Sequence, residues 1–387
     1  MQITSKLAQN ETTIFTVMSA MAKQYQAVNL GQGFPDYDCD VELKQLVSKH
    51  LNAGKNQYAP MAGVPALRDA IRQKIAHTHQ ADIDADTQIC ITAGATQAIF
   101  TAILAFVRSG EEVIVIEPAF DCYLPAIQLA GGIPKIYSMR YPDYQIDWEA
   151  LGQLISDRTS MILINSPHNP TGTILRKEDL LQLERLVAGK DIIVLSDEVY
   201  EHLIYDDESH QSVLRFPNLM AQSIAVFSFG KTFHATGWKI GYCVGAPNLI
   251  AEFKNIHQWN VFSVNSFVQY AIAEYLENPA SYELLPDFFQ TKRNLLTEVL
   301  EDIPMQPKLS EGTYFQLYHY AEISDQDDFS FAKHLTRSIG VTTIPLSPFY
   351  TNPPDDQVIR LCFAKNESTL LEAANRLKKL NSYTIRH

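Results

Sequence analysis

In the middle of the chain, short apolar runs alternate with longer segments of helical periodicity. The apolar runs are rich in isoleucine, valine and leucine and lie at 86–94, 111–120, 159–172, 191–200, 223–231 and 240–246. The segments at 95–110, 123–132 and 177–190 have the spacing of helices that cover a core. Near-continuous apolar strands that alternate with helices are typical of a mostly parallel sheet with both faces buried. The pattern therefore predicts a large α/β domain, which we place at residues 41–275.

The pattern changes toward the C-terminus. Residues 288–303 have helical periodicity, 313–320 and 357–365 alternate as strands do, and 368–380 form an amphipathic closing segment. These elements predict a smaller α+β domain at residues 276–387. Residues 1–40 show no regular pattern, and we expect them to form an irregular N-terminal arm that is part of the smaller domain.

Composition narrows the class of protein. The 387 residues are 46% hydrophobic and carry a formal net charge of −13, which indicates a globular protein without the basic surface that nucleic-acid binding needs. The longest apolar stretch, 98–107, is too short to span a membrane, and the first residues lack the apolar segment of a signal peptide. The five cysteines are scattered without a Cys-x-x-Cys pair, so we expect no metal site and a reducing, cytoplasmic location.

Polar and small residues follow the apolar runs, at the strand ends where open α/β sheets bind ligands. Gly94, Ala95 and Thr96 form a strand-to-helix turn whose small side chains would let a phosphate approach the backbone N–H groups, although an ordinary tight turn has the same pattern. Phe120 follows another strand, where it either stacks on a flat ring or only packs in the core.

The next two runs end in amide and carboxylate side chains. Asn165 and Asn169 lie in a proline-rich turn, where they either bind a ring substituent or only shape the turn. Asp197 ends a wholly apolar strand, and Tyr200 follows three residues later. A buried carboxylate needs a partner, and the alternative is that Asp197 caps a helix.

Lys231 follows the last of these runs in the sequence Gly-Lys-Thr, between Ser228 and Lys239. This is not a phosphate-binding P-loop, because Ala225 stands where that motif needs a glycine and Gly237 interrupts any following helix. A strand-end lysine among small polar residues is either a catalytic amine or a solvated loop residue.

Together these strand ends supply a turn that can bind a phosphate, an aromatic side chain that can stack on a ring, a donor to a ring oxygen, a buried carboxylate and a lysine. Pyridoxal 5′-phosphate needs all five, because it has a phosphate arm, a flat pyridine ring, a phenolic oxygen, a ring nitrogen that works best protonated and an aldehyde that condenses with lysine. The sequence therefore predicts this cofactor.

Three longer segments carry a family resemblance, namely NSPHNPTG at 165–172, SDEVYEHLIY at 196–205 and SFGKTFHATGWKIGY at 228–242. They resemble the signatures of the fold-type I, class I/II aminotransferases, which depend on pyridoxal phosphate. The segments GQGFPD, NQYAPMAGVPALRDAI, EGTYF and IRLCFAK are most similar to bacterial methionine aminotransferases and to the related kynurenine/glutamine transaminases. The resemblance extends from about Thr12 to the last helix and implies a mixed, mostly parallel seven-stranded sheet in the large domain.

The resemblance also implies individual roles. Lys231 would carry the cofactor as a Schiff base and then shuttle the substrate proton, Asp197 would pair with the pyridine nitrogen, and Tyr200 would bond the phenolic oxygen. Further cofactor contacts are implied for Gly94, Ala95, Thr96, Phe120, Asn165, Asn169, Ser228, Lys239 and, from a neighbouring subunit, Tyr58. Substrate contacts are implied for Gly33, Asn169, Arg360, Phe15 and, from the neighbouring subunit, Phe262.

Arg360 is the residue for which pattern and resemblance differ. The resemblance implies that it binds the substrate α-carboxylate through a bidentate pair. The alternation of its strand alone would place it on the exposed face, opposite Ile359 and Leu361.

The function implied is ping-pong transfer of the α-amino group of methionine, phenylalanine, tyrosine or histidine to a 2-oxo acid by a homodimer with shared active sites. One alternative is kynurenine/glutamine transamination or β-elimination from cysteine S-conjugates on the same scaffold. A more remote alternative is a non-catalytic aminotransferase-like sensor domain of a transcription regulator. The sensor is disfavoured, because the matching region begins near residue 12 and leaves no room for a DNA-binding domain before it.

Overall fold

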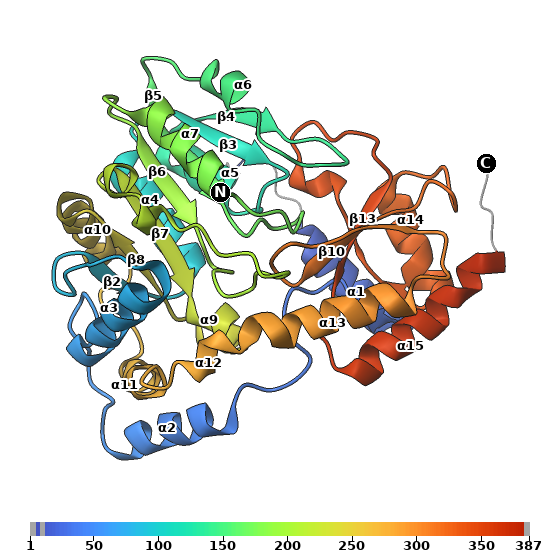
Figure 1. Ribbon diagram of the computed structural model, residues 1–387, viewed down its shortest axis with the longest axis horizontal. Helices are drawn as coiled ribbons and strands as arrows, with labels where there is room; N and C mark the ends of the chain where they lie inside the picture. Colours follow the sequence, from blue (N-terminus) through green and yellow to red (C-terminus); the bar gives the residue numbers. More distant parts are fainter. Residues whose placement is uncertain (1–4, 8–11, 383–387) are drawn as a thin grey trace, which may run out of the picture.

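The computed structural model describes residues 5–7 and 12–382, and its largest sheet has seven strands in the order β2-β8-β7-β6-β5-β3-β4 (Figure 1). The strands are β2 Ile89–Thr92, β3 Glu112–Glu117, β4 Ile133–Ser138, β5 Thr159–Asn165, β6 Ile193–Asp197, β7 Ser223–Ser228 and β8 Gly241–Gly245. Among these seven, β8 alone runs against the others, because it pairs antiparallel with both of its neighbours. The predicted α/β fold with a mixed, mostly parallel seven-stranded sheet is confirmed.

Both faces of this sheet are buried, which explains the near-continuous apolar runs. In β3, Ile114 and Ile116 belong to one hydrophobic core, whereas Val113 and Val115 belong to the other. One face is covered by α4 Ala95–Phe106, α5 Tyr123–Ala130 and α10 Pro247–Asn260, and the opposite face by α3 Pro65–His79, α7 Lys177–Val187 and α11 Ser266–Tyr275. Strands buried on both faces have no exposed side to reveal a period of two.

A second, antiparallel sheet lies at the right of Figure 1, in the order β12-β13-β10-β9. Its strands are β9 Gln306–Lys308, β10 Phe315–His319, β12 Ile344–Pro345 and β13 Val358–Cys362, and the neighbouring helices are α13 Leu285–Val299, α14 Asp328–His334 and α15 Glu367–Leu377. Apart from α1, the remaining α-helices of the described residues are α2 Val41–Asn52, α6 Trp148–Gly152, α8 Pro217–Met220, α9 Phe229–Thr232 and α12 Ala280–Glu283.

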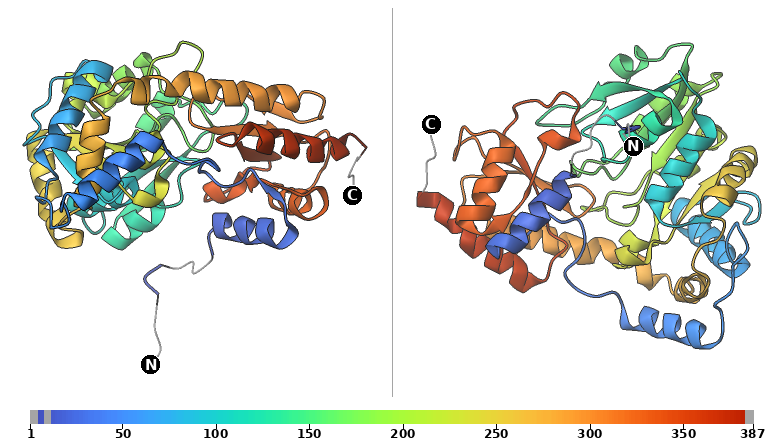
Figure 2. Two further views of the ribbon diagram at one scale, coloured as in Figure 1. Left: turned by 90° about the horizontal axis from the view of Figure 1, so that it is seen from below. Right: turned by 180° about the vertical axis from the view of Figure 1, so that it is seen from behind.

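The expectation of an irregular arm is wrong for part of the N-terminal region. Helix α1 spans Ile14–Tyr25, begins at a Thr13 cap that accepts a hydrogen bond from the Thr16 N–H, and buries Met18 and Met21. The chain then forms β1 (Val28–Asn29), which pairs in parallel with β11 (Val341–Thr342). Figure 2 shows α1 against the second sheet and its helices. Residues 1–4 and 8–11 of the predicted arm lie outside the described residues, and the domain limits at 40 and 275 stay a prediction.

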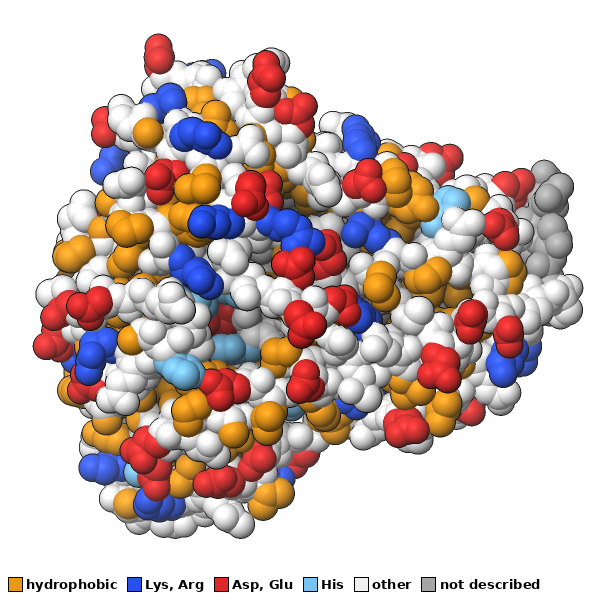
Figure 3. All heavy atoms as spheres, viewed as in Figure 1, with side chains coloured by type: hydrophobic (Ala, Val, Ile, Leu, Met, Phe, Trp, Pro, Cys, Tyr) orange, Lys and Arg blue, Asp and Glu red, His pale blue; other side chains and the backbone are white. Residues whose placement is uncertain are grey.

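Over residues 5–7 and 12–382, no helix is long and apolar enough to cross a membrane, and no group of three His, Cys, Asp or Glu side chains is placed to hold a metal ion. On the face shown in Figure 3, acidic and basic side chains are interspersed.

Candidate active site

Three parallel strands of the large sheet end at one edge and carry predicted site residues there. Asn165 of β5 and Asp197 of β6 are aligned partners in the register, and Ser228 ends β7. A cavity of about 340 Å³ lies at this edge. Of the predicted residues, those that line it are Phe15, Gly33, Gly94, Ala95, Thr96, Phe120, Asn165, Asn169, Asp197, Tyr200, Ser228, Lys231, Lys239 and Arg360. The structure thus brings all of them together except Tyr58 and Phe262.

Lys231 enters the cavity from the short helix α9. The helix begins at Ser228, whose hydroxyl accepts a hydrogen bond from the Lys231 N–H at 3.3 Å. The amine of the half-buried side chain donates to the Tyr314 hydroxyl at 2.7 Å and to the Gly33 carbonyl at 3.1 Å. Burial lowers the pKa of the amine to about 8, and the nearby positive charge of Arg360 adds to this effect. Lys231 is therefore held as an amine that changes protonation state near neutral pH, and not as a solvated loop residue.

Asp197 is buried, with 4% of its surface exposed. The Tyr123 hydroxyl donates to its Oδ2 at 2.6 Å, and the Val199 N–H donates to its Oδ1 at 3.3 Å. Burial raises the pKa of the carboxyl to about 6, although these hydrogen bonds and the charge of Lys231 oppose the rise. A cation placed against this carboxylate would stabilise its charged form.

The two asparagines of the proline-rich turn have different positions. The Asn165 amide donates to the Asp197 carbonyl at 2.8 Å and accepts from the Asn169 N–H at 2.8 Å, so its polar atoms hold two strand ends together. The Oδ1 of Asn169 accepts a hydrogen bond from Arg360 at 2.7 Å. The amide nitrogen of Asn169 stays available to a ligand in the cavity.

Arg360 is buried with only 1% of its surface exposed, so the exposed position that alternation alone suggested is wrong. Its strand β13 lies between β12 and β10, and all five of its residues are buried. The guanidinium lies 3.8 Å from the centroid of the Phe315 ring and donates to the Gly31 carbonyl at 3.1 Å. Its Nε is buried without a hydrogen-bond partner. A buried donor of this kind is costly unless a ligand supplies an acceptor, and a carboxylate suits the planar fork of an arginine.

The start of helix α4 also lines the cavity. Gly94, with a φ of 82°, precedes the helix, and no side chain caps the first N–H groups. A Cβ at Gly94 would lie 3.4 Å from the Lys239 amine, which shows how closely this lysine covers the turn. Free backbone N–H groups, the positive end of a 12-residue helix and a lysine together suit a phosphate.

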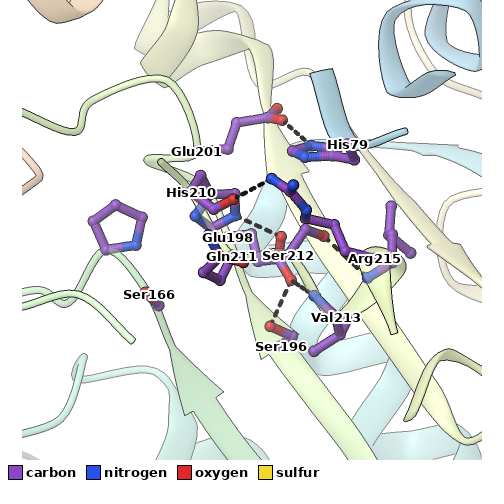
Figure 4. A network of polar contacts seen from close by, with 12 residues as sticks. His79, Ser166, Ser196, Glu198, Glu201, His210, Gln211, Ser212, Val213 and Arg215 are labelled. Atoms are coloured by element: carbon purple, nitrogen blue, oxygen red, sulfur yellow. Dashed lines mark hydrogen bonds and ion pairs between the residues drawn. The ribbon is translucent and has the colours of Figure 1, made fainter. Parts of the chain in front are cut away.

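A network of buried charges supports the turn that carries Asp197 and Tyr200 (Figure 4). Glu198 accepts hydrogen bonds from Ser196 at 2.8 Å, from the Val213 N–H at 3.1 Å and from His210 at 2.7 Å. Asp197, which lines the cavity, is thus followed directly by a glutamate whose side chain is bound away from the cavity.

The second glutamate of this network, Glu201, binds helix α3 and strand β8. It accepts from Lys74 at 2.7 Å, from His79 at 2.9 Å and from Tyr242 at 3.2 Å. Burial alone would raise the pKa of Glu201. The neighbouring Lys74 and histidines nevertheless hold this pKa well below its usual value. Lys74 and Glu201 are 2% and 5% exposed, so each depends on the other for its charge.

Tyr58 and Phe262 do not line the cavity. Their side chains are 83% and 45% exposed, and the two rings meet edge to face with centroids 5.4 Å apart. Large aromatic side chains on the surface are typical of contact sites.

Sequence reasoning missed two hydroxyl groups of the site. Tyr123 supplies the hydrogen bond to Asp197, and Tyr314 supplies the one to Lys231. Both stand in segments that drew attention for other residues, Tyr123 three residues after Phe120 and Tyr314 within EGTYF. Neither contact has a sequence signal, because both join elements that are far apart along the chain.

Comparison with known proteins gives consistent matches. The family model for aminotransferases of class I and II matches residues 25–377. A methionine aminotransferase of Escherichia coli (strain K12) is 48% identical over 377 residues, which cover 97% of this chain and 98% of the relative. A kynurenine–oxoglutarate transaminase of Dictyostelium discoideum is 34% identical, and the alignment covers 95% of this chain and 94% of the relative. A crystal structure of an Escherichia coli protein reported to have a methionine aminotransferase function aligns with a TM-score of 0.96 at 47% identity, covering 98% of this chain and 100% of that one.

The first prediction concerns the Lys231 amine. Because its pKa is lowered to about 8, about half of it should be neutral at pH 8, whereas an ordinary lysine is less than about 1% neutral there. Acetic anhydride labelling of the ligand-free protein, read by mass spectrometry, should rise through a midpoint near pH 8 at Lys231. Lys44, whose pKa is raised by its hydrogen bond with Asp38, is the internal control and should label only at higher pH. Equal midpoints at the two lysines would contradict the burial argument.

The second prediction concerns the buried ion pair. Lys74→Met should lower the free energy of unfolding by about 3–5 kcal/mol, because it leaves the Glu201 charge buried without its cation. Arg72→Met, on the same helix but with a 41% exposed side chain, should cost less than about 1 kcal/mol. Urea unfolding of the two variants measures the difference, and similar losses would show that the Lys74–Glu201 pair does not hold the turn.

Proposed function

The chain belongs to the class I and II aminotransferases, and from this membership we propose that it uses pyridoxal phosphate to move the α-amino group of methionine or an aromatic amino acid to a 2-oxo acid. The observation that carries the proposal is the single cavity that holds the Lys231 amine, the Asp197 carboxylate and the Arg360 guanidinium. An amine, an acid and a carboxylate receptor within one cavity are the groups that this reaction requires.

The residues of the cavity fit the cofactor from end to end. The uncapped N–H groups at Ala95 and Thr96, with Ser228 and Lys239, would hold its phosphate. Phe120 would stack on the ring, and the buried carboxylate of Asp197 suits a protonated ring nitrogen. The free amide of Asn169 and the hydroxyl of Tyr200 would bond the phenolic oxygen, and Asn165 would align the two strand ends behind it.

When bound, pyridoxal phosphate supplies an aldehyde that condenses with amines and a ring that withdraws electrons from the substrate Cα. The protein's own groups do the rest. Lys231 would take the proton from the substrate Cα and deliver it to C4′, the carbon that carries the cofactor's aldehyde, which its pKa of about 8 allows near neutral pH. Arg360, held over the Phe315 ring, binds and orients the α-carboxylate.

The substrate side chain would lie against apolar rings. Phe15 lines the cavity and Gly33 borders the carboxylate position. Among the described residues that line the cavity, Arg360 is the one arginine, so a second carboxylate on the substrate would be buried without a partner. A flexible, polarizable thioether and aromatic rings suit such a pocket.

A homodimer completes this proposal. Tyr58 and Phe262 lie outside their own chain's cavity and are exposed as a pair. We place them against the neighbouring subunit, where Tyr58 would reach the phosphate and Phe262 the substrate side chain. We also propose a cytoplasmic location, which the five free cysteines support. The domain limits at 40 and 275 are part of the same proposal.

The alternative on the same scaffold is kynurenine/glutamine transamination or elimination from cysteine S-conjugates. It is favoured by the 34% identity to a kynurenine transaminase. Incubation with a cysteine S-conjugate and no oxo acid distinguishes elimination, because elimination releases thiol, ammonia and pyruvate continuously whereas transamination stops after one turnover.

The third prediction tests the substrate class. The specificity constant kcat/KM for methionine should be the highest or near-highest of a panel with phenylalanine, tyrosine, histidine and aspartate. Aspartate should be at least about 100-fold poorer, because burying an unpaired carboxylate costs several kcal/mol. Lys231→Ala should show no turnover with any donor and serves as the blank. A higher kcat/KM for aspartate than for methionine would refute the pocket argument.

The fourth prediction concerns Asp197→Asn. The amide keeps the shape and can still accept from Tyr123, but it cannot hold a protonated ring nitrogen. The rate constant for Cα deprotonation should fall by about 10³-fold or more, while cofactor affinity changes little. Stopped-flow absorbance gives the rate, and titration with pyridoxal phosphate gives the affinity. If only the affinity falls, Asp197 has a structural role.

A further inference from the structure

Tyr314 contacts the catalytic amine but has no role in the function proposed so far. It belongs to the segment EGTYF, directly before strand β10, and its side chain is fully buried. Its hydroxyl donates to the Gly33 carbonyl at 2.5 Å and accepts from the Lys231 amine at 2.7 Å. The amine also reaches the same Gly33 carbonyl, at 3.1 Å, so the three groups form a closed triangle.

The surroundings fix this hydroxyl in place. The Tyr314 ring meets the edge of the Tyr200 ring with centroids 5.1 Å apart and packs against Phe289 at 5.9 Å. The preceding Thr313 has a φ of 68°, and its N–H donates to the Leu203 carbonyl at 2.9 Å. A Cβ at Gly33 would lie 2.8 Å from the Phe315 ring, so glycine lets the carbonyl come close enough to complete the triangle.

The partners of Lys231 differ in what they can do chemically. A backbone carbonyl only accepts hydrogen bonds, and it therefore suits any N–H of the amine but never its lone pair. A hydroxyl both donates and accepts, and burial keeps the pKa of Tyr314 well above 10, so it retains its proton. The charged amine can donate to the hydroxyl, and the neutral amine can accept from it. An amine that carries a proton between two substrate atoms must pass through both forms.

We propose that Tyr314 is the positioning residue for the free amine of Lys231, holding it against the Gly33 carbonyl and exchanging donor and acceptor roles with it as the amine gains and loses the transferred proton. The inference rests on the proposed function, in which Lys231 moves that proton. Tyr314 acts through Lys231 and not on the substrate.

The other ionisable groups near the amine remain the same when only this hydroxyl is removed. They are Asp197 on β6, Tyr200 on the following turn, Lys239 after the short helix, and Arg360 and Cys362 on β13. A change in the titration of Lys231 in a Tyr314→Phe variant therefore reports the lost hydroxyl. Tyr318→Phe is the matched control, because Tyr318 is a buried tyrosine on β10 whose hydroxyl binds Gln316 and not Lys231.

The first measurement needs no catalysis. In cofactor-free protein, acetic anhydride labelling of Lys231 against pH should give a midpoint that is about half a unit to one unit lower in Tyr314→Phe than in the unchanged chain. The charged amine loses a charge-assisted hydrogen bond, which is stronger than the neutral one that the uncharged amine loses. Tyr318→Phe should keep the original midpoint.

The second measurement uses the loaded enzyme. The single-turnover rate with methionine should fall about 10- to 100-fold in Tyr314→Phe, with its pH profile displaced in the same direction as the labelling midpoint, while KM changes less than about 3-fold. A midpoint and rate equal to those of Tyr318→Phe would overturn the proposal. If labelling shifts but the unchanged chain performs no transamination, the contact is real and the proposed function is what fails.

Discussion

The site depends on keeping the Asp197 carboxylate charged where water is almost absent. Burial raises its pKa to about 6, so at neutral pH the protein holds the ionised form against a substantial desolvation cost. The Tyr123 hydroxyl and the Val199 N–H offset part of this cost, and the charge of the nearby Lys231 amine offsets a smaller part. A cationic ring nitrogen would offset the remainder. The same buried carboxylate that destabilises the empty site thus favours the cofactor form that withdraws electrons best.

This arrangement requires a rigid turn behind the carboxylate, and the buried charges around it provide one. Glu198 directly follows Asp197 and Glu201 directly follows Tyr200, and each glutamate is bound by buried residues that do not line the cavity. Such pairs add little net stability when compared with apolar packing, but they have strict geometric requirements. Because Lys74 comes from α3 and Tyr242 from β8, the turn is tied to both the helical layer and the sheet.

The local part of this structure could be predicted from the sequence, and the long-range part could not. Apolar runs located the buried strands, and the rule that ligands bind at strand ends brought Asn165, Asp197 and Lys231 together correctly. The alternating pattern of β13 predicted an exposed Arg360, which is wrong, because all five residues of this strand are buried. The alternation within one strand does not show that other elements cover both of its faces. Helix α1 was also missed: its Thr13 cap is a local signal, but strand β11, against which the helix packs, lies far along the chain at Val341–Thr342, so the apolar face with Met18 and Met21 had no visible partner.

The distribution of charge explains why one cavity can hold two anions and still contain a reactive amine. Lys239 lies close to the start of α4, Arg360 lies over Phe315 and bonds Asn169, and Asp197 and Lys231 line the same cavity. A phosphate and a carboxylate are therefore drawn to separate places, which fixes the direction in which cofactor and substrate lie. The two cations that attract these anions also help to lower the pKa of Lys231, after burial itself. Binding and proton transfer are thus set by the same few charges, because the amine that must lose its proton lines the same cavity as both cations.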